Sequence, residues 1–246
     1  MSTKSFIYSF LASMLTVTLG FGQFENLSLE RPTEKSLAKK AILPGSLFLV
    51  GLLLSDSDFE RNFQAGLQDE LGNDFNTSLD DYIRYAPIAQ MYIADLAGVK
   101  AKNHWFDQTK NLVLSAAITQ LITAGMKKAI YKERPNAFNA EAFPSGHTSN
   151  AFANATVLYE EFKDSSALLA YSGYGFATAT GALRVMNNKH WLSDIFAGAA
   201  VGIIVTKLVY HFDYLFRWNP FKKKNDFTLL PSYSDGAMGL HLVKRF

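Results

Sequence analysis

The sequence predicts an all-α protein, an up-down helical bundle to which a short C-terminal β-hairpin is a candidate addition. Its apolar stretches are long enough for helices, none alternates apolar and polar residues like a strand, and polar connections separate them. The stretches cover residues 41–54, 86–98, 112–126, 148–159, 167–183 and 192–212. Neither a Pro/Ser-rich linker nor a repeat interrupts them, so we expect one domain over residues 23–224.

The first residues have the pattern of a secretory signal peptide. A short basic start over residues 1–4 precedes an apolar run over residues 6–18 and a small-residue exit over residues 20–23. We therefore assign residues 1–22 to a signal peptide. Because the cleavage position offers Gly rather than Ala, an uncleaved N-terminal membrane anchor is the alternative. In either case the rest of the chain is delivered across or into a membrane.

Two segments outside the apolar stretches have a predicted structure of their own. In the polar connection over residues 55–85, apolar residues recur at the spacing of an amphipathic helix. They are Phe59, Phe63, Leu67 and Leu71. The C-terminal tail, residues 225–246, contains strand-like runs around turn residues that include Pro231 and Gly236, which predicts the β-hairpin.

Composition excludes several classes of protein. The net charge is only +2 and the basic residues are dispersed, so the chain lacks the electrostatic footprint of a nucleic-acid-binding protein. There is no cysteine, which excludes disulfides, thiolate metal sites and cysteine nucleophiles. The sequence also lacks His-Glu-x-x-His, paired-aspartate and Walker-type signatures, so we predict neither a metal ion nor a cofactor.

Three polar clusters stand beside the ends of predicted helices. Their members are Lys127, Arg134 and Pro135; Pro144, Ser145, Gly146 and His147; and Arg184, His190 and Asp194. Lys127 and Arg184 follow two helix ends, whereas His147 and His190 stand at the starts of the next helices. In an up-down bundle these four positions fall on the same end. The sequence therefore predicts that three fixed cations, two histidines and one carboxylate converge, as phosphoryl transfer through a histidine adduct requires.

The spacing of His190 and Asp194 suits a nucleophilic histidine. Residues four apart share a helix face, so the carboxylate can accept a hydrogen bond from one ring nitrogen and leave the other free. For this pair alone, a plain alternative is a helix-start histidine beside a first-turn carboxylate that favours the helix dipole.

The other two clusters suit the binding of an anion. Gly146 lets the backbone approach a ligand, and the helix start after it offers free amides. Taken alone, residues 144–147 could be an ordinary loop-to-helix turn. Lys127 could likewise serve only the C-terminal dipole of its helix, with Lys128 as the solvated member of the pair, and Arg134-Pro135 could simply end a loop.

Together, the three clusters resemble the signature of the type-2 phosphatidic acid phosphatase and vanadium haloperoxidase superfamily. That signature reads Lys-x6-Arg-Pro, then Pro-Ser-Gly-His, then Ser-Arg-x5-His-x3-Asp. The chain matches ten of its eleven specified positions in order, between Lys127 and Asp194. Leu183 stands where the family usually has serine, so we do not expect the supporting hydrogen bond of that serine, but no charged or nucleophilic group is lost.

The resemblance implies a role for each residue. His190, oriented by Asp194, would attack phosphorus and form a phosphohistidine, while His147 would protonate the leaving oxygen and then activate water. The residues implied to hold the phosphate oxygens are Lys127, Arg134, Ser145, Gly146 and Arg184. Because His190 must be neutral while His147 is protonated, we expect a bell-shaped rate around mildly acidic to neutral pH. No metal is implied.

Hydropathy gives conflicting indications on whether the helices span a membrane. Mean hydropathy is near zero, and Asp95 and Lys207 interrupt apolar stretches, which favours buried helices of a water-facing protein. In contrast, residues 192–212 are long and lead to the basic residues Arg217 and 222–224, as in a cytoplasmic anchor. The catalytic end of that helix would then face the periplasm or the cell exterior.

These observations leave three enzymatic functions. We expect an exported or membrane-associated phosphatase that hydrolyses phosphate mono- or diphosphoesters, with a phosphorylated lipid as substrate. The alternative is a soluble periplasmic acid phosphatase of broad specificity. A vanadium-dependent haloperoxidase is the least favoured, because members with that activity tend to be larger. A non-enzymatic membrane scaffold would leave the complete set of clusters unexplained.

Overall fold

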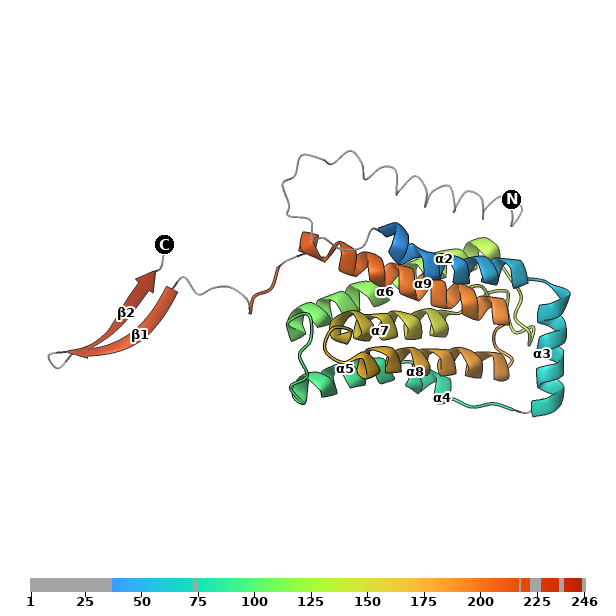
Figure 1. Cartoon of the computed structure of the whole chain (residues 1–246), viewed down its shortest axis with the longest axis horizontal. Helices are drawn as coiled ribbons and strands as arrows, with labels where there is room; N and C mark the ends of the chain where they lie inside the picture. The colour runs from blue at the N-terminus through green and yellow to red at the C-terminus, as the bar shows by residue number, and fades with distance from the viewer. Residues whose placement is uncertain (1–36, 73–74, 217, 222–226, 235–236, 245–246) are drawn as a thin grey trace, which may run out of the picture. The chain divides into compact units, whose positions relative to one another are not determined.

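The computed structural model describes residues 37–72, 75–216, 218–221, 227–234 and 237–244 (Figure 1). The described residues form an all-α bundle, which confirms the predicted fold class. Its helices are α2 (Leu37–Leu54), α3 (Asp58–Leu71), α4 (Leu79–Ile83), α5 (Ala86–Leu96), α6 (Trp105–Ile130), α7 (Gly146–Phe162), α8 (Ala167–Met186) and α9 (Leu192–His211). The predicted signal peptide, residues 1–22, lies outside the described residues.

The chain divides into two compact units, with the boundary between Tyr214 and Leu215. In the second unit, β1 (Phe227–Ser234) pairs with β2 (Ala237–Lys244) in an antiparallel two-stranded sheet. The described strands agree with the β-hairpin expected in the tail.

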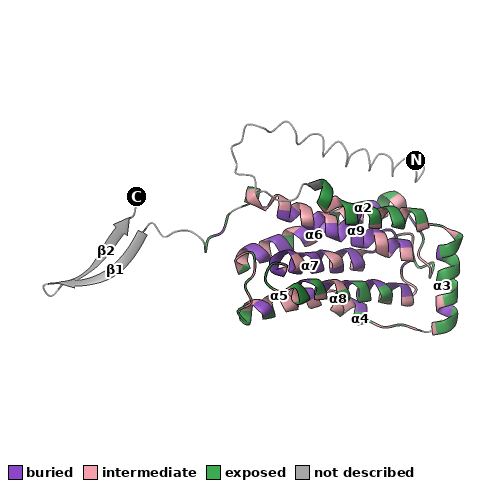
Figure 2. Cartoon of the chain, in the orientation of Figure 1, coloured by how far each residue is buried: buried purple, intermediate pink, exposed green. Residues whose placement is uncertain are grey.

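Helices α7 and α9 form the centre of the bundle. Helix α9 packs against α2, α6 and α7, and α7 packs against α5, α6 and α8 as well. Both α7 and α9 are buried along most of their length (Figure 2). A helix surrounded by neighbours is apolar on all sides, which explains why residues 192–212 read as a continuous apolar stretch.

Glycines allow α9 to press directly on the start of α7. A Cβ atom on Gly198 would lie 2.8 Å from the carbonyl oxygen of Ser145, and one on Gly202 would collide with the carbonyl oxygen of Ser149. Since neither glycine carries a Cβ atom, the two backbones come into contact. This contact places the first turn of α7 beside the second and third turns of α9.

Helix α6 begins at Trp105, before the apolar stretch that starts at residue 112. Its first turns carry Asp107, Gln108 and Asn111, which are polar and yet buried. A search for apolar residues does not detect such turns, because here polar side chains face the interior.

Helix α3 crosses the end of the bundle at an angle of 84° to α2 (Figure 1, right). Its position agrees with the predicted amphipathic helix, but its buried face is polar and contains Glu60, Gln64 and Gln68. Phe59 and Phe63 are exposed and stack on each other with ring centroids 6.2 Å apart. The apolar spacing therefore located the helix correctly but did not show which side packs inward.

Candidate active site

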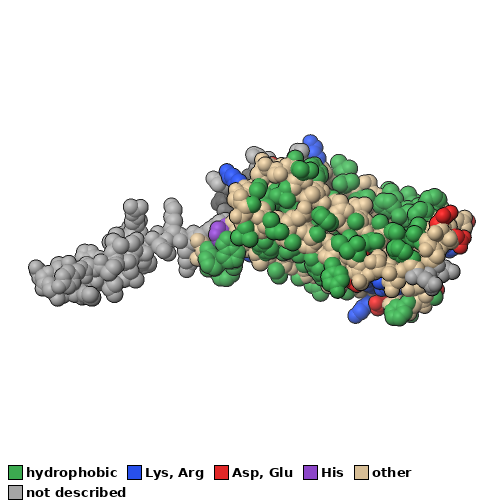
Figure 3. Space-filling model, turned by 90° about the horizontal axis from the view of Figure 1, so that it is seen from below, with side chains coloured by type: hydrophobic (Ala, Val, Ile, Leu, Met, Phe, Trp, Pro, Cys, Tyr) green, Lys and Arg blue, Asp and Glu red, His purple; other side chains and the backbone are tan. Residues whose placement is uncertain are grey.

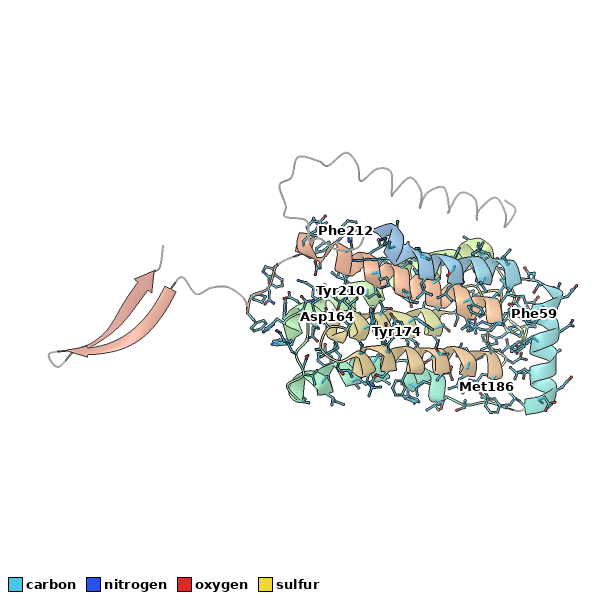
Figure 4. The ribbon with its side chains drawn as sticks, in the orientation of Figure 1. Phe59, Asp164, Tyr174, Met186, Tyr210 and Phe212 are labelled. Atoms are coloured by element: carbon cyan, nitrogen blue, oxygen red, sulfur yellow. The ribbon has the colours of Figure 1, made fainter. Side chains whose placement is uncertain are left out.

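The ends of four helices meet at one end of the bundle: the C-termini of α6 and α8 and the N-termini of α7 and α9. Phe59 of α3 and Met186 at the end of α8 lie at this end, whereas Asp164 and Tyr210 lie at the opposite one (Figure 4). Gln64 Nε2 and Gln68 Nε2 donate to the carbonyl oxygens of Val185 and Met186 at 3.1 and 3.2 Å. These bonds fasten α3 across the end where the predicted site residues gather.

His190 and Asp194 form a buried pair at the start of α9. His190 Nδ1 lies 3.3 Å from Asp194 Oδ2, and the two side chains are 1% and 0% exposed. The same Oδ2 accepts a hydrogen bond from the Trp191 N–H at 2.8 Å. Asp194 therefore caps α9 and also contacts His190. The helix-cap role and the histidine-orienting role that the sequence left open are both present. With the proton on Nδ1, Nε2 of His190 keeps its lone pair.

Burial lowers the pKa of His190 to about 4, although the hydrogen bond to Asp194 opposes this effect. The ring is consequently neutral at pH 7. A neutral imidazole oriented by a carboxylate is the form that can attack phosphorus.

His147 has a carboxylate partner of its own, from a different helix. Its Nε2 lies 2.6 Å from Oδ1 of Asp81 in α4, and the two side chains are 24% and 44% exposed. Burial lowers the pKa of His147 to about 4; Arg184 lowers it further, and the hydrogen bond to Asp81 raises it. That hydrogen bond lowers the pKa of Asp81 in return. The carboxylate thus favours the protonated imidazole that a general acid needs.

Arg184 is fixed by a buried ion pair. Its Nη1 donates to Oδ2 of Asp80 at 2.7 Å, and the side chains are 6% and 0% exposed. Asn187 Nδ2 donates to the other oxygen of Asp80 at 3.0 Å. This second bond prevents Asp80 from rotating away, so the guanidinium is held in one position.

The three predicted phosphate-binding cations lie close enough to affect one another. Burial lowers the pKa of Lys127 to about 8, and the positive charge of Arg134 adds to this effect. Arg134 also has a lowered pKa, because of burial first and the charge of Arg184 second. Among the described residues, Nε of Arg134 and Nε of Arg184 have no hydrogen-bond partner. An oxyanion bound between these groups would relieve their repulsion and accept hydrogen bonds from their free N–H groups.

Ser145 and Gly146 connect the start of α7 to the start of α9. The Ser145 N–H donates to the Asp194 carbonyl oxygen at 3.0 Å, and Ser145 Oγ accepts from Thr148 Oγ1 at 3.0 Å. The Ser145 hydroxyl therefore helps to cap α7 and still has its own hydrogen to donate. A Cβ atom on Gly146 would approach Thr123 and Lys127 no closer than 3.7 and 3.9 Å. The surrounding side chains therefore leave room for a Cβ atom at this position. The close approach of a ligand to the backbone explains the glycine better than packing does.

Asp80 and Asp81 are the site residues that sequence reasoning missed. They are adjacent acids at the start of a five-residue helix, and adjacency was the only available signal. With His147 they bring three potential metal-ligand atoms within 4.8 Å of one another. However, Asp80 already binds Arg184 and Asn187. A cation bound here would have to break the ion pair that positions Arg184.

Comparison with known proteins gives one family and a few relatives. Residues 108–218, which include all three clusters, match the family model of the PAP2 superfamily. Over 183 residues the chain is 32% identical to a lipid A 1-phosphatase of Porphyromonas gingivalis, a match that covers 72% of this chain and 40% of that protein. The chain thus spans well under half the length of that relative.

Two crystal structures match the chain at 19% sequence identity. LpxE of Aquifex aeolicus has a TM-score of 0.47, and the match covers 63% of this chain and 96% of LpxE. A transmembrane PAP2-type phosphatidylglycerolphosphate phosphatase of Bacillus subtilis has a TM-score of 0.49, with 72% of this chain and 99% of that one covered.

Proposed function

We propose, from the match of residues 108–218 to the family model of the PAP2 superfamily, that this chain is a phosphatase that hydrolyses phosphate mono- or diphosphoesters of a lipid without a metal ion. The observation that carries the proposal is the buried pair of His190 and Asp194 beside three mutually repelling cations. Such a cradle suits a phosphate dianion, and the paired imidazole supplies a nucleophile.

In the first half of the reaction, Nε2 of His190 attacks phosphorus while Asp194 accepts the hydrogen bond from Nδ1–H. A P–N bond forms as the P–O bond to the leaving group breaks, and His147 gives its proton to the departing oxygen. Arg184 and its neighbouring cations hold the equatorial oxygens, whose charge they neutralise. The product is a phosphohistidine and a neutral His147.

In the second half, His147 accepts a proton from water as the water oxygen attacks phosphorus. The P–N bond breaks, phosphate leaves, and His190 returns to its neutral form. Because the pKa of His147 is about 4 in the free protein, the acid form depends on Asp81 and on the bound phosphate dianion, both of which favour protonation.

Large apolar side chains exposed on the outside of the bundle support a lipid substrate and contact with a membrane. They include Ile42, Leu43 and Leu53 of α2, Val113 and Leu121 of α6, and Leu168 and Tyr171 of α8. Much of one face of the molecule is apolar (Figure 3). Large contiguous apolar patches are typical of surfaces that bind a membrane or a partner protein. The relative from Porphyromonas gingivalis is a lipid A 1-phosphatase, which supports a phosphorylated lipid as the substrate.

We propose that the enzyme is exported and membrane-associated, with its catalytic end toward the periplasm or the cell exterior. The predicted N-terminal export segment supports this location. Of the described helices, α9 is long and apolar enough to span a membrane, and α2 with α3 is so as a bent pair. Because 67% of the apolar segment of α9 is buried inside the bundle, a soluble periplasmic acid phosphatase is the second candidate.

Phosphate release by the purified full chain tests the proposal. The substrates are a lipid phosphate in mixed micelles and a soluble chromogenic phosphate ester, each assayed with EDTA. We expect release from both, a higher kcat/KM for the lipid, and no loss with EDTA. Equal use of both substrates, with recovery of the protein in the soluble fraction of cells, would select the second candidate. No release from either would refute the phosphatase.

A further inference from the structure

A buried ion network lies next to the carboxylate of the proposed nucleophilic pair. Lys132 Nζ is 2.9 Å from Glu60 Oε2, 2.7 Å from Ser193 Oγ and 3.5 Å from Asp194 Oδ1. The side chains of Lys132, Glu60 and Asp194 are 6%, 1% and 0% exposed. None of these contacts involves a group that we assign to the phosphate.

The network connects three separate parts of the fold. Glu60 comes from α3, Lys132 from the connection between α6 and α7, and Asp194 from the first turn of α9. Glu60 Oε1 also accepts a hydrogen bond from the Ser193 N–H at 2.8 Å. Glu60 therefore holds the start of α9 directly as well as through Lys132. Phe143 and Trp191 enclose the ammonium group, with ring centroids 5.9 and 5.6 Å from Nζ. A lysine held from several sides has little freedom to move.

The two oxygens of Asp194 have different partners. Oδ2 faces His190 Nδ1 and the Trp191 N–H. Among the described residues, Oδ1 has no hydrogen-bond partner, and its ion pair is with Lys132. Lys132 and the Trp191 N–H therefore each hold one oxygen of the carboxylate, and together they fix which oxygen faces the histidine.

Other cations attract Asp194 but cannot replace Lys132. Lys127 and Arg134 both interact with its charge, but in the proposed function they bind the phosphate. Their charge is shared with the substrate during each turnover. Lys132 is paired with Glu60 instead and is not among the groups assigned to the phosphate, so its charge is not shared with the substrate.

We propose that Lys132, held by Glu60, is a positioning residue that acts through Asp194 on His190 and keeps the histidine protonated on Nδ1. This role rests on the proposed phosphatase function, which uses Nε2 of His190 as the nucleophile. Without Lys132 the carboxylate can rotate, the Nδ1 tautomer loses its partner, and attack slows while phosphate binding is kept.

The test compares Lys132→Met with the wild-type full chain. We expect kcat for a soluble chromogenic phosphate ester to fall about 10- to 100-fold, the usual effect of losing a residue that orients a catalytic side chain. KM and inhibition by orthophosphate should change by less than about 3-fold, because the phosphate cradle is intact. The matched control is Lys128→Met, which removes an exposed lysine of α6 and should behave as wild type.

Nitrogen-15 NMR of labelled histidine gives a readout that does not depend on turnover. The His190 signals are identified by their loss in His190→Gln. We expect one Nδ1-protonated tautomer in the wild type and a mixture of tautomers in Lys132→Met. If the wild type hydrolyses neither ester, the proposed function fails, and the NMR result alone decides the positioning role.

A second variant separates positioning from stability, because Lys132→Met leaves Glu60 charged and buried without its cation. Glu60→Gln combined with Lys132→Met removes both charges and keeps an acceptor for the Ser193 N–H. We expect this double variant to fold with a thermal unfolding midpoint nearer the wild type, yet to keep the low kcat and the mixed tautomers. Wild-type kcat or a single Nδ1 tautomer in either folded variant would overturn the proposal.

Discussion

The replacement of Asp81 by asparagine tests whether α4 sets the acidity of His147. The carboxylate lies 2.6 Å from His147 Nε2, and it is one of the groups that raise the pKa of this histidine against burial. A hydrogen bond between an ionised pair contributes about 1.5–3 kcal/mol when buried. Because Asp81 is 44% exposed, we discount this to about 1 kcal/mol. That amount corresponds to about 0.7 pH unit.

The sign follows from the role of the proton. Asp81 raises the pKa of His147, so its loss lowers that pKa, and the basic limb of kcat should move down by about 0.7 pH unit. Above the limb kcat falls about five-fold, and well below it kcat is unchanged. The carboxylate also repels a phosphate dianion, so KM should fall in Asp81→Asn. For this reason kcat, rather than kcat/KM, isolates the effect on the acid.

The assay is the pH dependence of kcat for a soluble chromogenic ester, measured with wild type, Asp81→Asn and a control. Asp69→Asn is the matched control, because it removes an exposed carboxylate of α3. An unmoved basic limb in Asp81→Asn would show that His147 is not the acid, or that Asp81 does not act on it. A limb displaced to higher pH would refute the electrostatic reasoning.

Further expected outcomes concern the histidines and the helix contacts. His190→Ala and His147→Ala should each abolish phosphate release while circular dichroism stays native, and full activity in either variant would remove its assigned role. Since burial lowers the pKa of both histidines to about 4, kcat/KM should rise through that pH as His190 becomes neutral and fall as His147 loses its proton. A kcat/KM maximum above pH 7 would contradict this. Gly202→Ala should lower the free energy of unfolding by about 1–3 kcal/mol, because its methyl group would collide with the Ser149 carbonyl oxygen. Gly125→Ala, in a helix and with open space around it, should raise it by about 0.5–1 kcal/mol in the same urea titration.

The local sequence pattern predicted most of the bundle and the positions that converge. Apolar stretches of helical length correspond to α2 and α5 through α9, and alternation of helix direction placed four helix ends together. These features depend on residues close in sequence, which is why composition and spacing indicate them.

The rest depends on contacts between residues far apart in sequence. Asp81 meets His147, and Glu60 meets Lys132, across more than sixty positions in each pair. Only His147 stands in a motif; Asp81, Glu60 and Lys132 are charged residues that their own neighbourhood does not distinguish from solvated ones, apart from the adjacency of Asp80 and Asp81. The polar buried face of α3 could not be predicted for the same reason, because glutamine side chains are hydrophilic and are usually exposed.

The most direct test of the central claim is to trap the phosphoryl group on the protein. The wild-type chain is mixed rapidly with a phosphorus-32-labelled substrate and quenched in alkali, which preserves phosphohistidine. Peptides are then mapped by mass spectrometry. We predict an acid-labile phosphoryl group on the peptide that contains His190, and none in His190→Ala. A phosphoryl group on any other residue, or turnover with no covalent phosphate in the wild type, would contradict the account.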